Sequence, residues 1–471
     1  MQLCLDVFET MLTRSSFEFE RPLTGMEIEC NLVDAGYQPA MSNQEVLASI
    51  ADPAYQTELG AYNIEFNVPP RRLPGRAALE LEADVRASLN AAEAKANSDG
   101  AHIVMIGILP TLMPEHLSGG WMSDSTRYQA LENSIFTARG EDILIDIAGP
   151  ERLSLQLASI APESACTSMQ LHLQVSPAQF ANNWNAAQVI AGPQLALGAN
   201  SPYFFGHQLW PETRIELFAQ ATDTRPDELK SQGVRPRVWF GERWITSIFD
   251  LFEENVRYFP SLLPELSDED PVAALGEGRT PRLAELRLHN GTIWRWNRPV
   301  YDVVEGKPHL RVENRVLPAG PTVVDMLANA AFYYGMLRTL SEEDRPLWTK
   351  MSFAAAQHNF VASAEHGMEA LLYWPGLGEV TPDELVLRKL LPMADEGLRR
   401  WEVASEVRDR YLSVIEGRAK TGRNGASWQV ATVQALQERG MTRPSALAEM
   451  LRLYCERMHS NEPVHTWDGP D

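Results

Sequence analysis

Five short segments of this chain alternate apolar and polar residues with a period of two, and this pattern constrains the fold most strongly. Side chains of a strand point alternately to opposite faces, so the period predicts strands with one apolar and one polar face. The segments cover residues 24–33, 62–68, 167–175, 283–289 and 309–316. We expect the apolar faces to pack on helices in one sheet, which leaves the polar faces free to line a cleft.

Helical signals lie between and after these segments. They are apolar residues at helical spacing, a Ser-Pro start and two capping-box patterns. The corresponding helices are expected over residues 76–99 and from residues 177, 322 and 381. Residues 260–282 are rich in Pro, Asp, Glu and Gly and are predicted to form a loop or linker. This order predicts an α+β fold with a mainly antiparallel sheet and a helical final third.

Charge and cysteine content exclude several classes of protein. The formal net charge of -22 argues against nucleic-acid binding, and any anion site would need local positive charge or a metal ion. The four cysteines are scattered without a CxxC pair, which argues against a zinc knot or a disulfide framework and suits a reducing cytoplasm. The N-terminus lacks a signal-peptide pattern, and no apolar run approaches the length of a membrane span.

The polar face of the first segment places Glu27 and Glu29 side by side. Two unit charges about 5 Å apart repel by roughly 3 kcal/mol at an effective dielectric constant near 20. One interpretation is that these faces are simply solvated, as on many half-exposed sheets. The other is that a divalent cation holds the carboxylates together, with Glu65, His172 and Glu313 as further ligands. Such a ligand set suits Mg²⁺ or Mn²⁺ and does not suit structural zinc.

A second candidate site is the stretch "RAKTGRNGASWQV" at 418–430. Arg418, Lys420 and Arg423 cluster there beside two glycines in an otherwise very acidic chain. Glycines let backbone amides approach an anion, and the basic groups neutralise it. The alternative is an exposed loop between helices. The usual nucleotide-binding and hydrolase motifs, such as the Walker loop, GxGxxG, GxSxG and HExxH, are absent from the sequence.

Ordered blocks over most of the chain resemble the glutamate–cysteine ligase family of the glutamine-synthetase-like superfamily. The blocks are "GMEIE", "YNIEFNVPP", "MQLHLQV", "ELRLHNGTIWRWNRPV", "HLRVENRVLPAGP" and "TGRNGASWQ". The resemblance implies a six-stranded antiparallel sheet curled into a funnel that holds ATP and Mg²⁺. We accordingly expect a single catalytic domain over residues 1–456, with a sheet core at about 20–320, a helical region at 321–456 and a flexible tail at 457–471.

The resemblance also implies a reaction and roles for individual residues. ATP would phosphorylate the γ-carboxylate of glutamate, and an amine would then displace phosphate. The implied metal ligands are Glu27, Glu29, Glu65, His172 and Glu313. The implied catalytic residues are Arg298, Arg315 and Glu313, where the arginines hold the substrate carboxylate or the transferring phosphoryl group. Arg127, Tyr128, Arg287 and Thr292 are implied to bind substrates, and Arg418, Lys420 and Arg423 to lie near the ATP phosphates.

The acceptor amine is the least defined part of this expectation. Cysteine is the family default, and another amino acid or amine is the alternative. Two further hypotheses are a non-catalytic ligase-like binding protein and a metal-dependent hydrolase. The expected ligands are therefore glutamate, an amine and ATP, in a cytoplasmic protein without nucleic-acid or membrane partners.

Overall fold

The computed structural model describes residues 1–20, 22–263 and 265–469, and a seven-stranded sheet lies at its centre. The strand order is β12-β13-β7-β1-β3-β2, with β4 also paired to β1, and all neighbours are antiparallel. The strands are β1 (Thr24–Val33), β2 (Tyr55–Thr57), β3 (Asn63–Arg71), β4 (His102–Val104), β7 (Met169–Val175), β12 (Asn297–Val304) and β13 (Lys307–Asn314). Four of the five predicted strands are confirmed, and the sheet has one strand more than the six implied by the resemblance.

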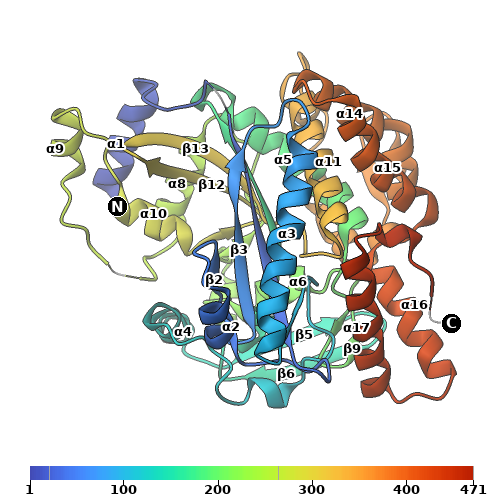
Figure 1. The fold of residues 1–471 in the computed structure, drawn as a ribbon. Helices are drawn as coiled ribbons and strands as arrows, with labels where there is room; N and C mark the ends of the chain where they lie inside the picture. Colours follow the sequence, from blue (N-terminus) through green and yellow to red (C-terminus); the bar gives the residue numbers. More distant parts are fainter. Residues whose placement is uncertain (21, 264, 470–471) are drawn as a thin grey trace.

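Helices cover the apolar face of this sheet in two layers (Figure 1). The first layer contains α3 (Ala77–Ser98), α5 (Pro177–Gly198) and α11 (Val323–Ser341). Strand residues such as Ile28 and Cys30 are fully buried beneath it. The second layer packs on α11 and contains α14 (Leu391–Arg400) and α15 (Ser405–Thr421). The α+β class with an antiparallel sheet backed by helices is therefore confirmed, and the polar face of the sheet is left to form a site.

The remaining elements surround this core. The other helices are α1 (Gln2–Thr13), α2 (Asn43–Ile50), α4 (Thr126–Arg139), α6 (Arg214–Ala221), α7 (Asp227–Ser231), α8 (Ile248–Tyr258), α9 (Pro271–Gly276), α10 (Ala284–Gly291), α12 (Phe353–His366), α13 (Pro382–Leu385), α16 (Gly425–Glu438) and α17 (Arg443–Ser460). Short strands pair as β5 (Ile143–Ala148) with β6 (Arg152–Leu157), β8 (Tyr203–Phe204) with β9 (His207–Gln208), β10 (Val238–Trp239) with β11 (Trp294–Arg295), and β14 (Leu372–Trp374) with β15 (Gly378–Val380). Short 3₁₀ turns are η1 (Pro114–Leu117), η2 (Ala161–Ala165), η3 (Leu347–Thr349), η4 (Gly367–Glu369) and η6 (Val464–Thr466).

The strand predicted over residues 283–289 is wrong, because this segment forms helix α10. Leu283, Leu286 and Asn290 are buried, at spacings of three and four residues, which is the helical period. The run "AELRL" consists of residues with high helix propensity, and so short a run satisfies both periods. Arg287 therefore projects from a helix and not from the central sheet.

The predicted helix starts agree with the structure at all four places. Helix α3 covers the expected range, the Ser176 hydroxyl accepts a hydrogen bond from Gln179 N, and the Thr322 hydroxyl accepts one from Asp325 N. Thr381 precedes a helix without capping it through its side chain, and that helix continues through a π-helical stretch, Val386–Leu390, into α14.

The C-terminal segment belongs to the packed body over its described part. Helix α17 crosses the expected boundary at 456 and continues to Ser460, and Trp467 is buried against Trp428 and Tyr454. Residues 470–471 of the expected tail lie outside the described residues. The predicted linker at 260–282 contains the short helix α9, capped by Asp270. A single catalytic domain stays a prediction. Within the described ranges, no helix has both the length and the apolar character to cross a membrane.

Candidate active site

The register of the sheet brings the polar residues of four separate segments into adjacent rows. Glu29 of β1 lies opposite Glu65 of β3, and Glu27 lies opposite Gln170 of β7. His172 of β7 in turn lies opposite Glu313 of β13. Because alternate side chains share a face, shifting a strand by one residue in register would have turned its polar side chains toward the core. The predicted polar residues therefore gather on one face, although they come from distant parts of the chain.

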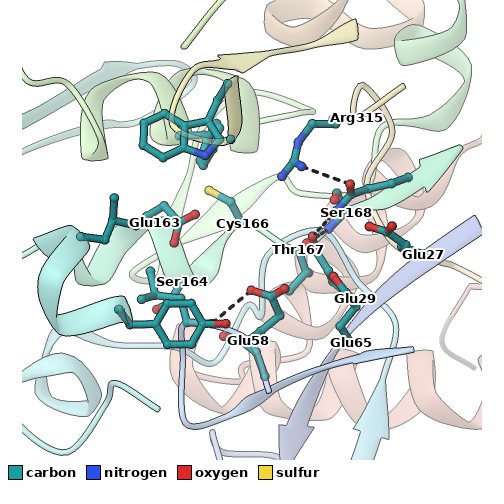
Figure 2. A pocket seen from close by; sticks show the side chains of 18 of the residues that line it. Glu27, Glu29, Glu58, Glu65, Glu163, Ser164, Cys166, Thr167, Ser168 and Arg315 are labelled. Atoms are coloured by element: carbon teal, nitrogen blue, oxygen red, sulfur yellow. Dashed lines mark hydrogen bonds between the residues drawn. The ribbon is translucent and has the colours of Figure 1, made fainter. Parts of the chain in front are cut away.

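This face forms one wall of a cavity of about 360 Å³ (Figure 2). The described lining carries five carboxylates and five guanidinium groups, so its formal charge is balanced in a chain of net charge -22. The acidic residues are Glu27, Glu29, Glu58, Glu65 and Glu163, and the basic residues are Arg127, Arg214, Arg287, Arg298 and Arg315. The local balance supplies the positive charge that an anionic ligand requires here.

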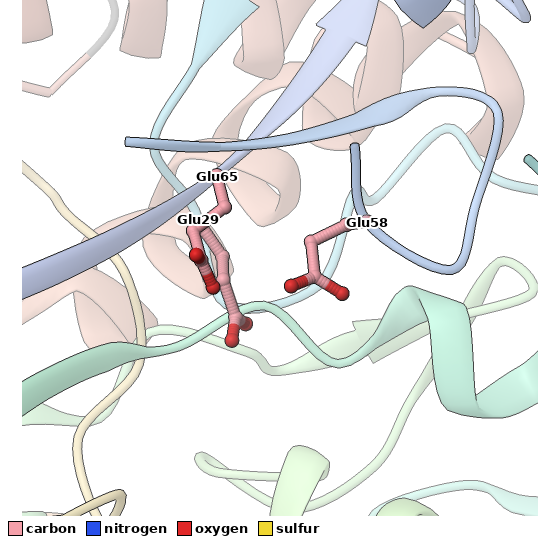
Figure 3. A group of neighbouring side chains, drawn as sticks. All are labelled: Glu29, Glu58 and Glu65. Atoms are coloured by element: carbon pink, nitrogen blue, oxygen red, sulfur yellow. The ribbon is translucent and has the colours of Figure 1, made fainter. Parts of the chain in front are cut away.

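Three of the carboxylates form a compact group (Figure 3). One oxygen from each of Glu29, Glu58 and Glu65 lies within 4.8 Å of the other two. Glu29 is held by the backbone N–H of Ser168 and by Gln170 Nε2, which donates at 2.9 Å. Asn67 Nδ2 donates to Glu65 at 2.6 Å. Glu29 and Glu65 are thus oriented before any ligand binds.

The protonation of the three-carboxylate group indicates that it can bind a cation. Burial raises the pKa of Glu65 to about 9, and the Glu58 and Glu27 carboxylates add to the effect. Burial likewise raises the pKa of Glu58 to about 8, with Glu29 and Glu163 contributing. Both raised pKa values favour the protonated form of Glu58 and Glu65 while the group holds no cation. Three clustered carboxylate oxygens are a donor set that fits a hard divalent cation such as Mg²⁺, which would replace these protons.

We expect the stability of the metal-free protein to fall as the pH rises from about 4.5 to about 9 because of these two groups. In that range the folded protein keeps protons on Glu58 and Glu65 that the unfolded chain releases, so a higher pH favours unfolding. Thermal unfolding in EDTA and in Mg²⁺ at several pH values measures this. Mg²⁺ should raise Tm more at high pH, and Glu65→Gln should flatten the dependence. An equal Mg²⁺ effect in that variant would contradict the assignment.

Glu27 and His172 form a close polar contact beside this group. His172 Nε2 lies 3.0 Å from Glu27 Oε1, while Arg311 Nε donates to His172 Nδ1 at 3.1 Å. Burial raises the pKa of Glu27, but the hydrogen bond and charge of His172 outweigh it, and the net shift is downward. Glu27 lines the cavity as an anion, whereas His172 lies behind it. Metal ligation by Glu27 and His172 stays a prediction, because neither belongs to the three-carboxylate group.

Glu313 links the two predicted catalytic arginines. Its carboxylate accepts hydrogen bonds from Arg298 Nη2 at 2.8 Å and from Arg315 Nη1 at 3.0 Å. Only 1% of Glu313 is exposed, and burial alone would raise its pKa, but the two guanidinium groups hold that pKa well below its usual range. Arg315 also donates to Gln170 at 3.1 Å. Glu313 thus orients two arginines that both line the cavity.

The four predicted substrate-binding residues all line the cavity. Arg127 and Tyr128 come from α4, where the Tyr128 hydroxyl donates to Thr57 O at 3.1 Å. Arg127 is exposed and forms no ion pair within the described residues. Arg287 pairs with Asp302 at 2.6 Å, and the buried Thr292 donates to His289 O. Arg127 is therefore the residue of this group best placed to receive an anion.

The three residues expected at the ATP phosphates do not come together at the cavity. Arg418 is 1% exposed and pairs with Asp325 at 2.8 Å, because its position on α15 faces α11. Lys420 pairs with Glu416 one turn away, and Arg423 donates to Trp467 O. None of the three is among the described residues that line the cavity. The structure assigns Arg418 to helix packing instead.

Sequence reasoning missed Glu58, Glu163 and Arg214, which also line the cavity. Glu58 follows the three-residue strand β2, which is too short to show a period. Glu163 lies on the 3₁₀ turn η2, and Arg214 begins α6 beside its ion-pair partner Glu212. The only signal for Glu58 was its position in the hairpin that leads to Glu65.

A family model and one solved structure agree with this architecture. Residues 23–450 match the model of glutamate-cysteine ligase family 2 (GCS2). The fold resembles the crystal structure of a glutamate–cysteine ligase from Francisella tularensis in complex with AMP, with a TM-score of 0.53, 12% identity, and coverage of 95% of this chain and 91% of that chain. A bifunctional glutathione synthetase from Pasteurella multocida aligns with a TM-score of 0.48 and 13% identity, over 97% of this chain and 55% of that chain. A search of curated proteins finds no match.

Proposed function

Since this chain belongs to glutamate-cysteine ligase family 2, we propose that it is an ATP-dependent ligase that joins the γ-carboxylate of glutamate to an amine. The product would form through γ-glutamyl phosphate, with ADP and phosphate released. The family supports the general class, a carboxylate–amine ligase. The nature of the acceptor and the intermediate belong to our proposal.

One observation carries the proposal: a cluster of carboxylates and a pair of arginines line the same cavity. Glu29, Glu58 and Glu65 form the cluster, and Arg298 and Arg315 are the pair. Phosphoryl transfer depends on positioning and charge neutralisation more than on a protein nucleophile. The arginines suit the glutamate carboxylate or the transferring phosphoryl group, because a guanidinium binds such anions through two parallel hydrogen bonds.

Mg²⁺ would be held by Glu29, Glu58 and Glu65, with Glu27 as a neighbouring carboxylate. When bound, such an ion neutralises the oxygens of a nucleotide triphosphate. The chain's own residues supply the rest. Arg315 and Arg298, held by Glu313, would fix the anion opposite this group. Ser168 N–H and Gln170 would keep Glu29 in its orientation through turnover.

The side chains with nucleophilic atoms in the cavity support a phosphorylated substrate over a phosphorylated enzyme. Burial and the Glu163 carboxylate raise the pKa of Cys166 well above its usual value, so its thiol stays protonated. Ser164 donates its hydroxyl proton to Ala161 O, and Thr167 donates to Ile106 O. No histidine lies among the described lining residues to act as their base. The γ-carboxylate of glutamate is then the nucleophile toward ATP.

Cysteine is the proposed acceptor, after the family's own name, and the product would serve glutathione or related thiol synthesis. Another amine is the alternative. ADP formation tests the whole proposal, measured with glutamate and amine present together or singly. A ligase requires both, a hydrolase requires neither amine nor glutamate, and a binding protein forms no ADP. A panel of acceptors read by product mass then identifies the amine.

A further inference from the structure

We propose that Glu163 receives the acceptor: it binds the ammonium group of the incoming amine beside an aromatic wall of the cavity. This inference rests on the ligase function proposed above and specifies the chemical class of the second substrate. The acceptor is a primary amine that enters in its protonated form and carries an apolar body.

Glu163 differs from the other carboxylates of the cavity because nothing in the described part of the chain satisfies it. Glu27 contacts His172, Glu29 accepts from Ser168 N and Gln170, and Glu65 accepts from Asn67. The Glu163 side chain forms no ion pair and no side-chain hydrogen bond among the described residues, and it does not belong to the Glu29–Glu58–Glu65 group. Figure 2 shows it beside Cys166, on the far side of the cavity from Glu27.

The carboxyl group of Glu163, unpaired within the described residues, favours a cation as its partner. Burial raises the pKa of Glu163 to about 8, Glu29 adds to the effect, and Arg315 opposes it. The ionised form is therefore unfavourable while the cavity is empty. An ammonium group at hydrogen-bond distance would stabilise the carboxylate and satisfy the hydrogen-bonding capacity of both groups.

The surroundings of Glu163 suit the carbon skeleton of an amine. Its turn, η2, packs against α6, which carries Phe218. The Phe218 ring meets Trp294 and Trp296 edge to face, at centroid distances of 6.0 and 5.9 Å. All three rings line the cavity. Aromatic faces attract an organic cation and cover an apolar body, so the wall and Glu163 recognise two parts of one ligand.

The test compares Glu163→Gln with the wild type on two kinds of acceptor. One kind is a panel of amines that are cationic at neutral pH, including cysteine, other amino acids, diamines and arylalkylamines. The other is hydroxylamine, which is largely unprotonated there because its oxygen lowers its basicity. We expect Glu163→Gln to lower kcat/KM for the best cationic amine by about 100-fold, the scale of losing one member of a buried charge pair. The KM for glutamate and the rate with hydroxylamine should stay roughly unchanged.

Glu216→Gln is the matched control, because Glu216 lies on α6, outside the described cavity lining, and accepts a hydrogen bond from Gln220 Nε2. Equal losses with both kinds of acceptor would overturn the proposal, because they would place Glu163 in metal binding or structure. So would an unchanged rate with cationic amines, or a wild type that uses hydroxylamine but no cationic amine. A wild type that forms neither product would instead refute the ligase function itself.

Discussion

Glu65→Gln is expected to lower glutamate- and amine-dependent ADP formation by about 1,000-fold, the loss that accompanies several kcal/mol of charge stabilisation by a metal ion. Glutamine keeps the shape of the side chain and the hydrogen bond from Asn67 Nδ2 but removes one of three anionic ligands. Glu65 is a cleaner choice than Glu29, because an amide at Glu29 would face the donors Ser168 N–H and Gln170 Nε2.

Two further measurements separate metal binding from folding in this variant. Mn²⁺ binding, followed by electron paramagnetic resonance, should weaken together with activity. The Tm in EDTA at high pH should rise, because the variant no longer ionises a carboxyl whose pKa is raised to about 9 by burial and its neighbours. Glu216→Gln should leave both properties unchanged. Full activity of Glu65→Gln at limiting Mg²⁺ would show that the three-carboxylate group is not the metal site.

Arg315→Lys should lower kcat/KM for glutamate or ATP by about 100-fold, the scale seen when one donor to a developing anion is removed. Lysine keeps the positive charge but loses the planar fork that bridges Glu313 and an anion in the cavity. Steady-state kinetics with each substrate varied in turn identifies which anion Arg315 binds.

Arg410→Lys is a stringent control for this change. Arg410 likewise donates to a glutamate, through Nε and Nη2 to the two oxygens of Glu82 at 2.8 and 2.7 Å, but it lies in the helical region outside the described cavity lining. Its replacement should leave kcat/KM roughly unchanged. If Arg315→Lys behaves in the same way, Arg315 is only the structural partner of Glu313.

The strands that carry the site could be predicted because each buries one face and leaves the other polar. Alternation over seven or more residues identified β1, β3, β7 and β13, and the register then aligned Glu27, Glu29 and Glu65 without any further signal. The same reasoning failed at α10, because residues 283–289 also alternate over seven residues but include a run of strong helix formers. Alternation over seven residues therefore does not by itself decide between a strand and a helix.

The rest of the site could not be predicted because it lies on elements without a period. Glu58 and Glu163 occupy a hairpin turn and a 3₁₀ turn, and only the folded chain brings them to the cavity. Arg418 is the opposite case, where a cluster of basic residues suggested an anion site. The helical phase of α15 instead turns Arg418 inward to Asp325. The sequence therefore located the basic residues correctly, but it could not show that the Arg418 side chain points toward α11.

The central claim is that the γ-carboxylate of glutamate attacks ATP, and an isotope experiment tests it directly. Glutamate labelled with oxygen-18 in its γ-carboxylate is turned over with ATP and any accepted amine, and the released phosphate is analysed by mass spectrometry. The carboxylate oxygen that bonds to phosphorus leaves with it when the amine displaces phosphate. We therefore predict one labelled oxygen in the phosphate for each amide formed. Amide product accompanied by unlabelled phosphate would contradict the acyl-phosphate pathway, and with it the roles given to the carboxylates and arginines of this cavity.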